Sequence, residues 1–128
     1  MSKDTNALNW FEIPALDTKR AKTFYESVFN IEMATMDMMG MEMTFFPASD
    51  EPNGKVSGAL VKGDMHKPSK DGAVIYLNAN PDIQAVLDRI GPNGGQVLMP
   101  KMFISEEIGY MAFFTDTEGN RLGLHARN

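Results

Sequence analysis

The chain has 128 residues, of which 43% are hydrophobic and 23% charged, a composition typical of one folded domain rather than a disordered segment. Its net charge is −5 with acidic and basic residues interspersed, so no basic surface for nucleic acid is indicated. It has no cysteine, no apolar run long enough to span a membrane and no apolar signal core in the first ten residues, and we therefore expect a cytoplasmic protein.

The first half of the chain predicts a strand, a helix and three further strands. Residues 8–13 have strand character, and Asp17 is a suitable N-cap for the helix that follows. One apolar stripe at helical spacing is formed by Ala21, Phe24, Tyr25, Val28 and Phe29. Asn30 is expected to end this helix, because Asn tolerates the left-handed conformation. Strands are predicted at 33–38, 41–46 and 56–61, with a turn-rich segment at 47–55 before the last of them.

The second half repeats this order. A strand is predicted at 73–79, and Asn80 is expected to cap a helix that has Pro81 in its first turn. Helical spacing recurs at Ile83, Val86, Leu87 and Ile90, and Gly91 should end this helix. Three more strands are predicted at 96–99, 110–115 and 121–125.

Equivalent features of the two halves are separated by a nearly constant distance. The separation is 64 residues from Trp10 to Val74 and 65 residues from Gly58 to Gly123. This spacing predicts one domain over residues 1–128 with an α+β fold, built from two tandem β-α-β-β-β modules at about 8–61 and 73–126 with a linker at 62–71. Two such modules, each with a helix on one face, can form a cupped mixed sheet around a central cavity.

Two motifs at the ends of this repeat resemble those of a known family. FEIPALDTKRAKTFYESVFN, residues 11–30, resembles the first strand and helix of glyoxalase-like proteins, and FFTDTEGNRLGLH, residues 113–125, is similar to their C-terminal signature. The chain is therefore identified by resemblance as a member of the glyoxalase/bleomycin-resistance protein/dioxygenase (vicinal oxygen chelate) superfamily. The resemblance implies paired modules, a cupped central site and often a homodimer.

The resemblance also implies where a metal would bind. Metal-dependent members take four ligands, usually His, Gln or Glu, from the first and last strands of the two modules. Those positions fall on Trp10, Gly58, Val74 and Gly123, none of which has a side chain that can ligate a divalent cation. We therefore expect no metal site and no cofactor, with a divalent metal as the alternative.

Alternation along the strands predicts a ligand-binding set in the cavity. If the expected ligand positions face inward, the cavity-facing residues include Trp10, Glu12, Tyr76 and His125. A carboxylate in an apolar strand is costly without a purpose, which makes Glu12 the candidate catalytic base or hydrogen-bond acceptor. Structural roles remain open: Glu12 could lie in water or pair with an arginine, Trp10 and Tyr76 could be core residues, and His125 could fray near the chain end.

Two other combinations of side chains could bind a metal, and the sequence disfavours both. A Glu12/His125 pair supplies too few ligands for a tight site. Six methionines within residues 33–43 could suit Cu(I), but methionine is more often an apolar filler on adaptable surfaces, so a flexible lip of the cavity is the favoured interpretation.

Three functional hypotheses follow. The first is a small-molecule binding protein without the usual metal site, with no nucleic-acid or membrane partner. The second is a lyase, isomerase or dioxygenase that uses Glu12 as base or ligand. The third is an interaction module in which Trp10, Tyr76 and the methionines fill the cavity. The fold does not discriminate among them, because function depends on the site.

Overall fold

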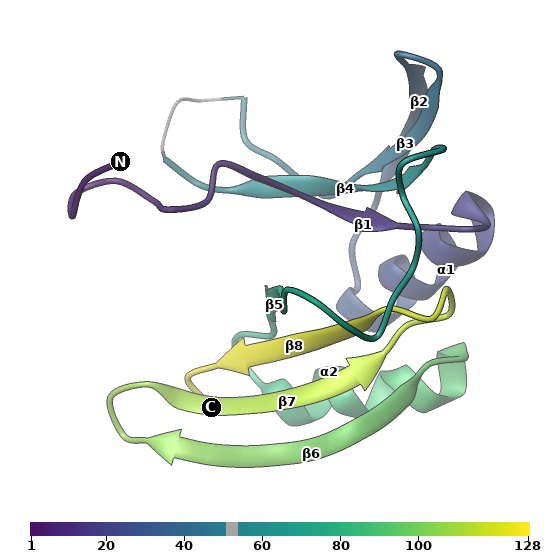
Figure 1. Ribbon diagram of the computed structural model, residues 1–128. Coiled ribbons are helices and arrows are strands. Elements are labelled where there is room, and N and C mark those ends of the chain that lie inside the picture. The colour runs from purple at the N-terminus through teal and green to yellow at the C-terminus, as the bar shows by residue number, and fades with distance from the viewer. Residues whose placement is uncertain (51–53) are drawn as a thin grey trace.

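The computed structural model describes residues 1–50 and 54–128, and residues 51–53 of the predicted turn segment lie outside it. It contains two four-stranded sheets, each with one helix (Figure 1). The first sheet has the order β1-β4-β3-β2, and the second has the order β5-β8-β7-β6. In each sheet the first strand pairs in parallel with the last, and the remaining pairs are antiparallel. The sheets are not closed into a barrel, so the predicted α+β fold with two tandem modules and a cupped sheet is confirmed.

The elements of the first module are β1 (Trp10–Pro14), α1 (Thr18–Phe29), β2 (Ala34–Met38), β3 (Met41–Phe45) and β4 (Ser57–Lys62). Asp17 caps α1 as predicted, because its side chain accepts a hydrogen bond from the backbone N–H of Arg20. Asn30 ends the helix in the left-handed conformation, with φ 55°. The predicted apolar stripe is the buried face of α1.

The elements of the second module are β5 (Tyr76–Asn78), α2 (Ile83–Ile90), the short 3-10 helix η1 (Gly91–Asn93), β6 (Gln96–Ser105), β7 (Gly109–Thr115) and β8 (Arg121–Ala126). The prediction of Asn80 as the cap of α2 was wrong. Asp82, two residues later, accepts from the N–H of Gln84, whereas the side-chain oxygen of Asn80 accepts from the backbone N–H of Arg127.

Strand β6 runs six residues beyond the predicted end at residue 99. Pro100 follows that predicted end, and proline cannot donate to a strand ladder. The strand lies at the edge of the second sheet, however, and its pairing with β7 shifts register between Met99 and Met102. An edge strand with a bulge tolerates a proline, which explains why this strand continues.

One core holds the two modules together. It contains buried residues of both helices and of the helix-facing sides of both sheets, including Ile13 and Leu60 of the first sheet and Phe114 and Leu122 of the second. The sheet faces opposite the helices are left outside this core. No helix among residues 1–50 and 54–128 is long and apolar enough to cross a membrane.

Candidate functional site

Trp10 and Glu12 lie on the same side of β1, opposite α1. Their neighbours Phe11 and Ile13 pack into the core, so alternation turns Trp10 and Glu12 the other way. The indole Nε1 of Trp10 donates to Oε2 of Glu12 at 3.2 Å. The predicted pairing of these two side chains on one face is therefore present in the structure.

The side of the first sheet that faces away from α1 is mainly apolar, and we call it the open face. Its members follow from strand register and alternation: Trp10, Glu12, Ala34, Met36, Met38, Met41, Met43, Phe45, Ser57, Ala59 and Val61. Met43, Ala59 and Val61 form a small buried cluster of their own, with Met41 and Phe45 packed against it. The rings of Trp10 and Phe45 lie 6.1 Å apart between centroids. Among the eleven residues assigned to this face, Glu12 alone has a charged side chain.

His66 reaches Glu12 from the segment that connects the modules. Residues 63–75 leave the end of β4 and pass in front of β1 on the way to β5 (Figure 1). In this segment Nε2 of His66 lies 2.7 Å from Oε1 of Glu12, and the His66 side chain is 16% exposed. Its other ring nitrogen, Nδ1, is buried without a hydrogen-bond partner in the described structure. Glu12 thus has one oxygen held by an indole and the other by an imidazole.

Tyr76 and His125 lie on the second sheet, on the face opposite α2. Tyr76 pairs with Gly123, and its ring covers that glycine: a Cβ there would lie 2.5 Å from a ring carbon. Nε2 of His125 lies 2.7 Å from the backbone oxygen of Ile108, which ties the end of β8 to the β6–β7 turn. Tyr76, His125, Ile104 and Met111 line a pocket of about 410 Å³.

The four predicted site residues therefore fall into two groups. Trp10 and Glu12 form one group with His66, and Tyr76 and His125 line a separate pocket. The pocket lined by Tyr76 and His125 includes neither Trp10 nor Glu12, and the pocket that Glu12 lines includes neither Tyr76 nor His125.

The placement of Gly58 in the cavity was wrong by one residue. Gly58 pairs with Phe11 on the helix side, where an added Cβ would lie 2.3 Å from the Phe11 backbone oxygen. Ala59 pairs with Glu12 just as Gly123 pairs with Tyr76, so the register repeats at 64 residues. Ala59 is therefore the open-face equivalent of Gly123.

The residues at the expected ligand positions do not fit a divalent metal. After this correction the four positions hold Trp10, Ala59, Val74 and Gly123, which offer no side-chain donor of the kind that such an ion prefers. Across residues 1–50 and 54–128 there is also no group of three or more His, Asp or Glu side chains arranged to hold a metal ion. No metal-dependent step can be derived from this donor set.

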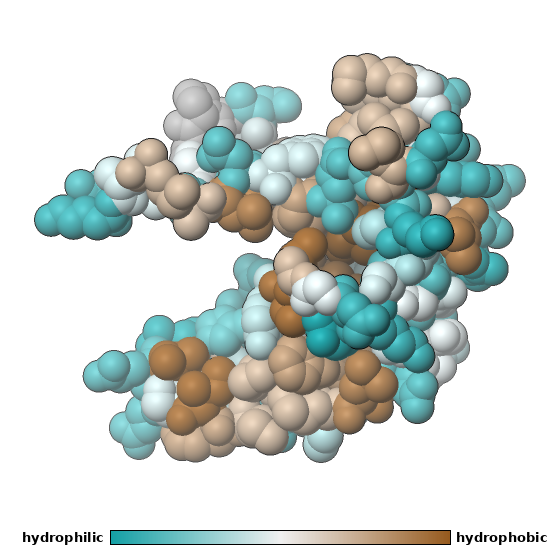
Figure 2. Space-filling view, viewed as in Figure 1, coloured by the Kyte–Doolittle hydropathy of each residue, from teal (hydrophilic) through white to brown (hydrophobic). Residues whose placement is uncertain are grey.

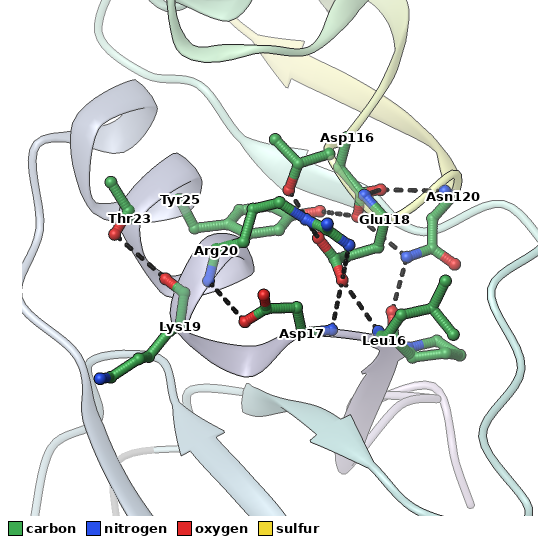
Figure 3. A network of polar contacts seen from close by, with 11 residues as sticks. Leu16, Asp17, Lys19, Arg20, Thr23, Tyr25, Asp116, Glu118 and Asn120 are labelled. Carbon is green, nitrogen blue, oxygen red and sulfur yellow. Dashed lines mark hydrogen bonds and ion pairs between the residues drawn. The ribbon is translucent and has the colours of Figure 1, made fainter.

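The D-T-E-G-N turn between β7 and β8 joins the two modules (Figure 3). One carboxylate oxygen of Glu118 accepts from the backbone N–H groups of Leu16 and Asp17, at 2.8 and 2.7 Å. The guanidinium of Arg20 donates to both oxygens of Glu118, at 2.8 and 3.1 Å. Glu118 thereby fixes the start of α1 to the second sheet.

Asp116 makes a second link in the same turn. It accepts from the hydroxyl of Tyr25 at 2.8 Å and from the side-chain amide of Asn120 at 2.9 Å. That amide also donates to the backbone oxygen of Pro14 at 2.7 Å. The turn is thus hydrogen-bonded to Tyr25 of α1 and to Pro14 of β1. The signature motif therefore has a structural role in this chain, because it connects the second sheet to the first module.

The surroundings of this turn shift the pKa values of Glu118 and of Tyr25, which contacts it. Burial by itself would raise the pKa of Glu118, but hydrogen bonds from Arg20, the Asp17 backbone and Thr117 outweigh burial and lower this pKa. The pKa of Tyr25 is raised well above its ordinary value, first because the ring is buried and then because Asp116 faces its hydroxyl. Glu118 is therefore held as an anion and Tyr25 as a neutral phenol.

The sequence reasoning did not identify His66 or the inter-module role of Glu118. His66 is one of only two histidines, which was a signal, but it contacts Glu12 across 54 residues. Nothing in local spacing indicates such a contact. The acidic turn was recognised only as part of a motif.

Comparison with known proteins agrees with this geometry. The family described as the Glyoxalase/Bleomycin resistance protein/Dioxygenase superfamily matches residues 7–124. CFP32 of Mycobacterium tuberculosis, which bears a glyoxylase name, is 32% identical over 123 residues; these cover 94% of this chain and 45% of that protein, so the chain spans about half of that relative's length.

Two solved structures share the fold at low identity. A glyoxalase/bleomycin resistance protein from Albidiferax ferrireducens has a TM-score of 0.71 and 16% identity, covering 96% of this chain and 100% of that one. TnmS3, an antibiotic binding protein from a Streptomyces species, has a TM-score of 0.68 and 22% identity, covering 99% of this chain and 100% of that one.

Proposed function

Because this chain belongs to the glyoxalase/bleomycin resistance protein/dioxygenase superfamily, we propose that it binds a small, partly apolar organic molecule on the open face of the first sheet, without a divalent metal or other cofactor. The observation that supports this most strongly is the placement of Glu12 on this face and its contacts there. Its carboxylate is held from both sides, by Trp10 and His66, on a face otherwise made of methionine, aromatic, small and aliphatic side chains. Such a face binds by apolar contact and selects by one polar group.

The class of ligand follows from these contacts. Trp10, Phe45 and three methionines, Met36, Met38 and Met41, offer flat and adaptable apolar surface, which suits an aromatic or bulky aliphatic body. A carboxylate accepts hydrogen bonds and attracts cations, so the ligand carries an amine or hydroxyl group that reaches Glu12. The antibiotic-binding name of the Streptomyces neighbour is compatible with a ligand of this kind.

The exposure of the site argues against an interaction module with a filled cavity. That hypothesis requires Trp10, Tyr76 and the methionines to fill the cup. Trp10 is instead 42% exposed and Tyr76 48% exposed, and Met36 remains 53% exposed. These side chains are available to a ligand.

A second candidate function is catalysis as a lyase, isomerase or dioxygenase, with Glu12 as the base. The contact that favours it is the 2.7 Å pair between Glu12 and His66, since an imidazole beside a carboxylate can orient it and exchange its proton. The glyoxylase name of the mycobacterial relative points the same way. Glu12→Gln would abolish turnover under this alternative and leave the fold intact.

A homodimer is part of the proposal. The apolar face of the second sheet, which includes Tyr76, is exposed, and hydrophobic side chains gather over β6 and β7 and on the β2–β3 hairpin (Figure 2). In such a dimer, the second sheet of one copy would cover the open face of the first sheet of the other. Tyr76 and His125 of one copy would then lie beside Glu12 of the other and complete one ligand site. A cytoplasmic location, expected from the cysteine-free composition, belongs to the same proposal.

The test is a thermal-shift screen of aromatic and aliphatic amines and alcohols, followed by calorimetric titration of the hits. Hits should bind the wild type saturably and bind Glu12→Gln more weakly. Glu42→Gln is the matched control, because Glu42 lies on β3 of the same sheet but alternates to the opposite face. Absence of any saturable ligand, or equal loss in both variants, would count against the proposal.

A further inference from the structure

A second pocket lies between the two modules and adjoins the open face at Glu12. It has a volume of about 220 Å³ and is bounded by the end of β1, the connecting segment and the start of β8. Apolar walls come from Ile13, Ile75 and Leu122, and cationic groups come from Lys67 and Arg121. The proposed open-face site explains neither cation.

Arg121, which lines this pocket, carries a hydrogen-bond donor without a partner in the described structure. Its backbone N–H donates to the oxygen of Ser69 at 3.1 Å, and its Nη2 donates to the oxygen of Gly72 at 2.9 Å. These bonds fix the guanidinium between the connecting segment and β8. Its Nε, however, is buried without a partner in the described structure. A buried donor left without an acceptor costs about 1–3 kcal/mol. A ligand atom that accepts a hydrogen bond from Nε would remove this cost.

Two basic side chains, Lys67 and Arg121, and two acidic ones, Glu12 and Asp71, line the pocket, and the acceptor would lie at the basic pair. Within the part of the chain that the structure describes, no carboxylate forms an ion pair with Lys67 or Arg121. Glu12 also borders the pocket and its negative charge opposes an anion, although Trp10 and His66 hold both of its oxygens. Asp71 also opposes an anion; its side chain is exposed to water, as is that of Lys67, so solvent screens both charges.

We propose that this inter-module pocket binds a small organic carboxylate. The carboxylate accepts from Nε of Arg121 and lies near the ammonium of Lys67, and a short apolar body contacts Ile13, Ile75 and Leu122. Planar carboxylate and guanidinium groups match in geometry, and charge-assisted bonds of this kind are among the strongest in proteins. The bound molecule would contact both modules through β1, β8 and the connecting segment, at a site that shares only Glu12 with the open face.

The test uses benzoate as the probe and benzamide as its neutral, equally sized control. Titration is followed by NMR at two side-chain groups: the Nε–H of Arg121, assigned from its loss in Arg121→Gln, and the indole Nε1–H of Trp10. We expect benzoate to shift the Arg121 signal saturably, with benzamide much weaker. Lys67→Gln should raise the Kd about tenfold, Asp71→Asn should lower it, and Lys70→Gln, a neighbour outside the pocket lining, should leave it unchanged.

Three results would overturn the inference. Benzamide could bind as well as benzoate, which would remove the role of charge. Benzoate could shift the Trp10 signal and leave Arg121 unmoved, which would place it on the open face. Lys67→Gln could bind like the wild type, which decides the question even if Arg121→Gln disturbs the connector. Failure of ligand binding at Glu12 would not produce any of these patterns.

Discussion

The imidazole of His66 lies 2.7 Å from the carboxylate of Glu12, although the two residues belong to a connecting segment and to the first strand. The connector thus completes the polar centre of an apolar sheet face. His66 is a positioning residue in this account, because it holds one oxygen of Glu12 while Trp10 holds the other.

Loss of His66 should weaken ligand binding by leaving Glu12 free to rotate. We expect His66→Leu to raise the Kd of an open-face ligand severalfold, because each hydrogen bond to a charged group contributes about 1.5–3 kcal/mol. His66→Gln retains an N–H donor and should recover part of the affinity. Calorimetric titration of both variants measures these affinities. If His66→Leu binds like the wild type, the 2.7 Å contact between His66 and Glu12 does not contribute to ligand binding.

Metal retention should be below one equivalent per chain. The positions of Trp10, Ala59, Val74 and Gly123 supply no donor atoms from their side chains. The measurement is elemental analysis after incubation with Mn, Fe, Co, Ni and Zn followed by gel filtration. One tightly retained equivalent would mean that other residues, such as Glu12 with His66, form a site in solution, and catalysis would then become the leading function.

Replacement of Glu118 should lower the stability in a pH-dependent way. The folded-state pKa of Glu118 is below the ordinary 4.5, so its contribution is present above that value and is lost as the pH falls through the lowered pKa. At neutral pH we expect Glu118→Gln to reduce the free energy of unfolding by about 1–3 kcal/mol. The difference from wild type should shrink in acid.

Urea denaturation at pH 7 and at successively lower pH measures both effects. Glu107→Gln, an exposed glutamate on the β6–β7 turn, is the control and should change stability little at any pH. A difference for Glu118→Gln that stayed constant from neutral pH into acid would show that the carboxylate is not held by Arg20 and the α1 backbone.

Two glycines of the last strands should respond differently to alanine. At Gly58 the added Cβ meets a backbone oxygen of Phe11 at 2.3 Å, which only movement of β1 can relieve. At Gly123 it meets the ring of Tyr76, a half-exposed side chain that can swing away. We expect Gly58→Ala to destabilise the fold by about 1–3 kcal/mol and Gly123→Ala by less. Thermal and urea unfolding of the two variants decide this, and the reverse order would contradict the register of β1 on β4.

The sequence was sufficient for the fold because each element carried local signals. The N-cap Asp17, the stripe of α1 and the left-handed Asn30 act within a few residues of one another, and the module repeat confirmed them. Errors arose where distant pairing decided the outcome. Edge position let β6 continue past Pro100, and strand register placed Ala59 rather than Gly58 beside Glu12.

The candidate site was predictable only in part, for the same reason. Alternation correctly put Trp10 and Glu12 on one face, because both lie on one strand. It could not reveal His66, which arrives through a connector, or the separation of Tyr76 and His125 into a pocket on the other sheet. Contacts between segments far apart in the chain leave no trace in local spacing.

The most direct test of the central claim uses the fluorescence of Trp10, the single tryptophan, which is hydrogen-bonded to Glu12. The best amine from the thermal-shift screen is titrated into the wild type, Glu12→Gln and Glu42→Gln. The account predicts a saturable change with similar Kd in the wild type and Glu42→Gln, and a Kd at least about tenfold higher in Glu12→Gln. Equal affinity in all three proteins would contradict the account, because the open-face carboxylate would then have no part in recognition.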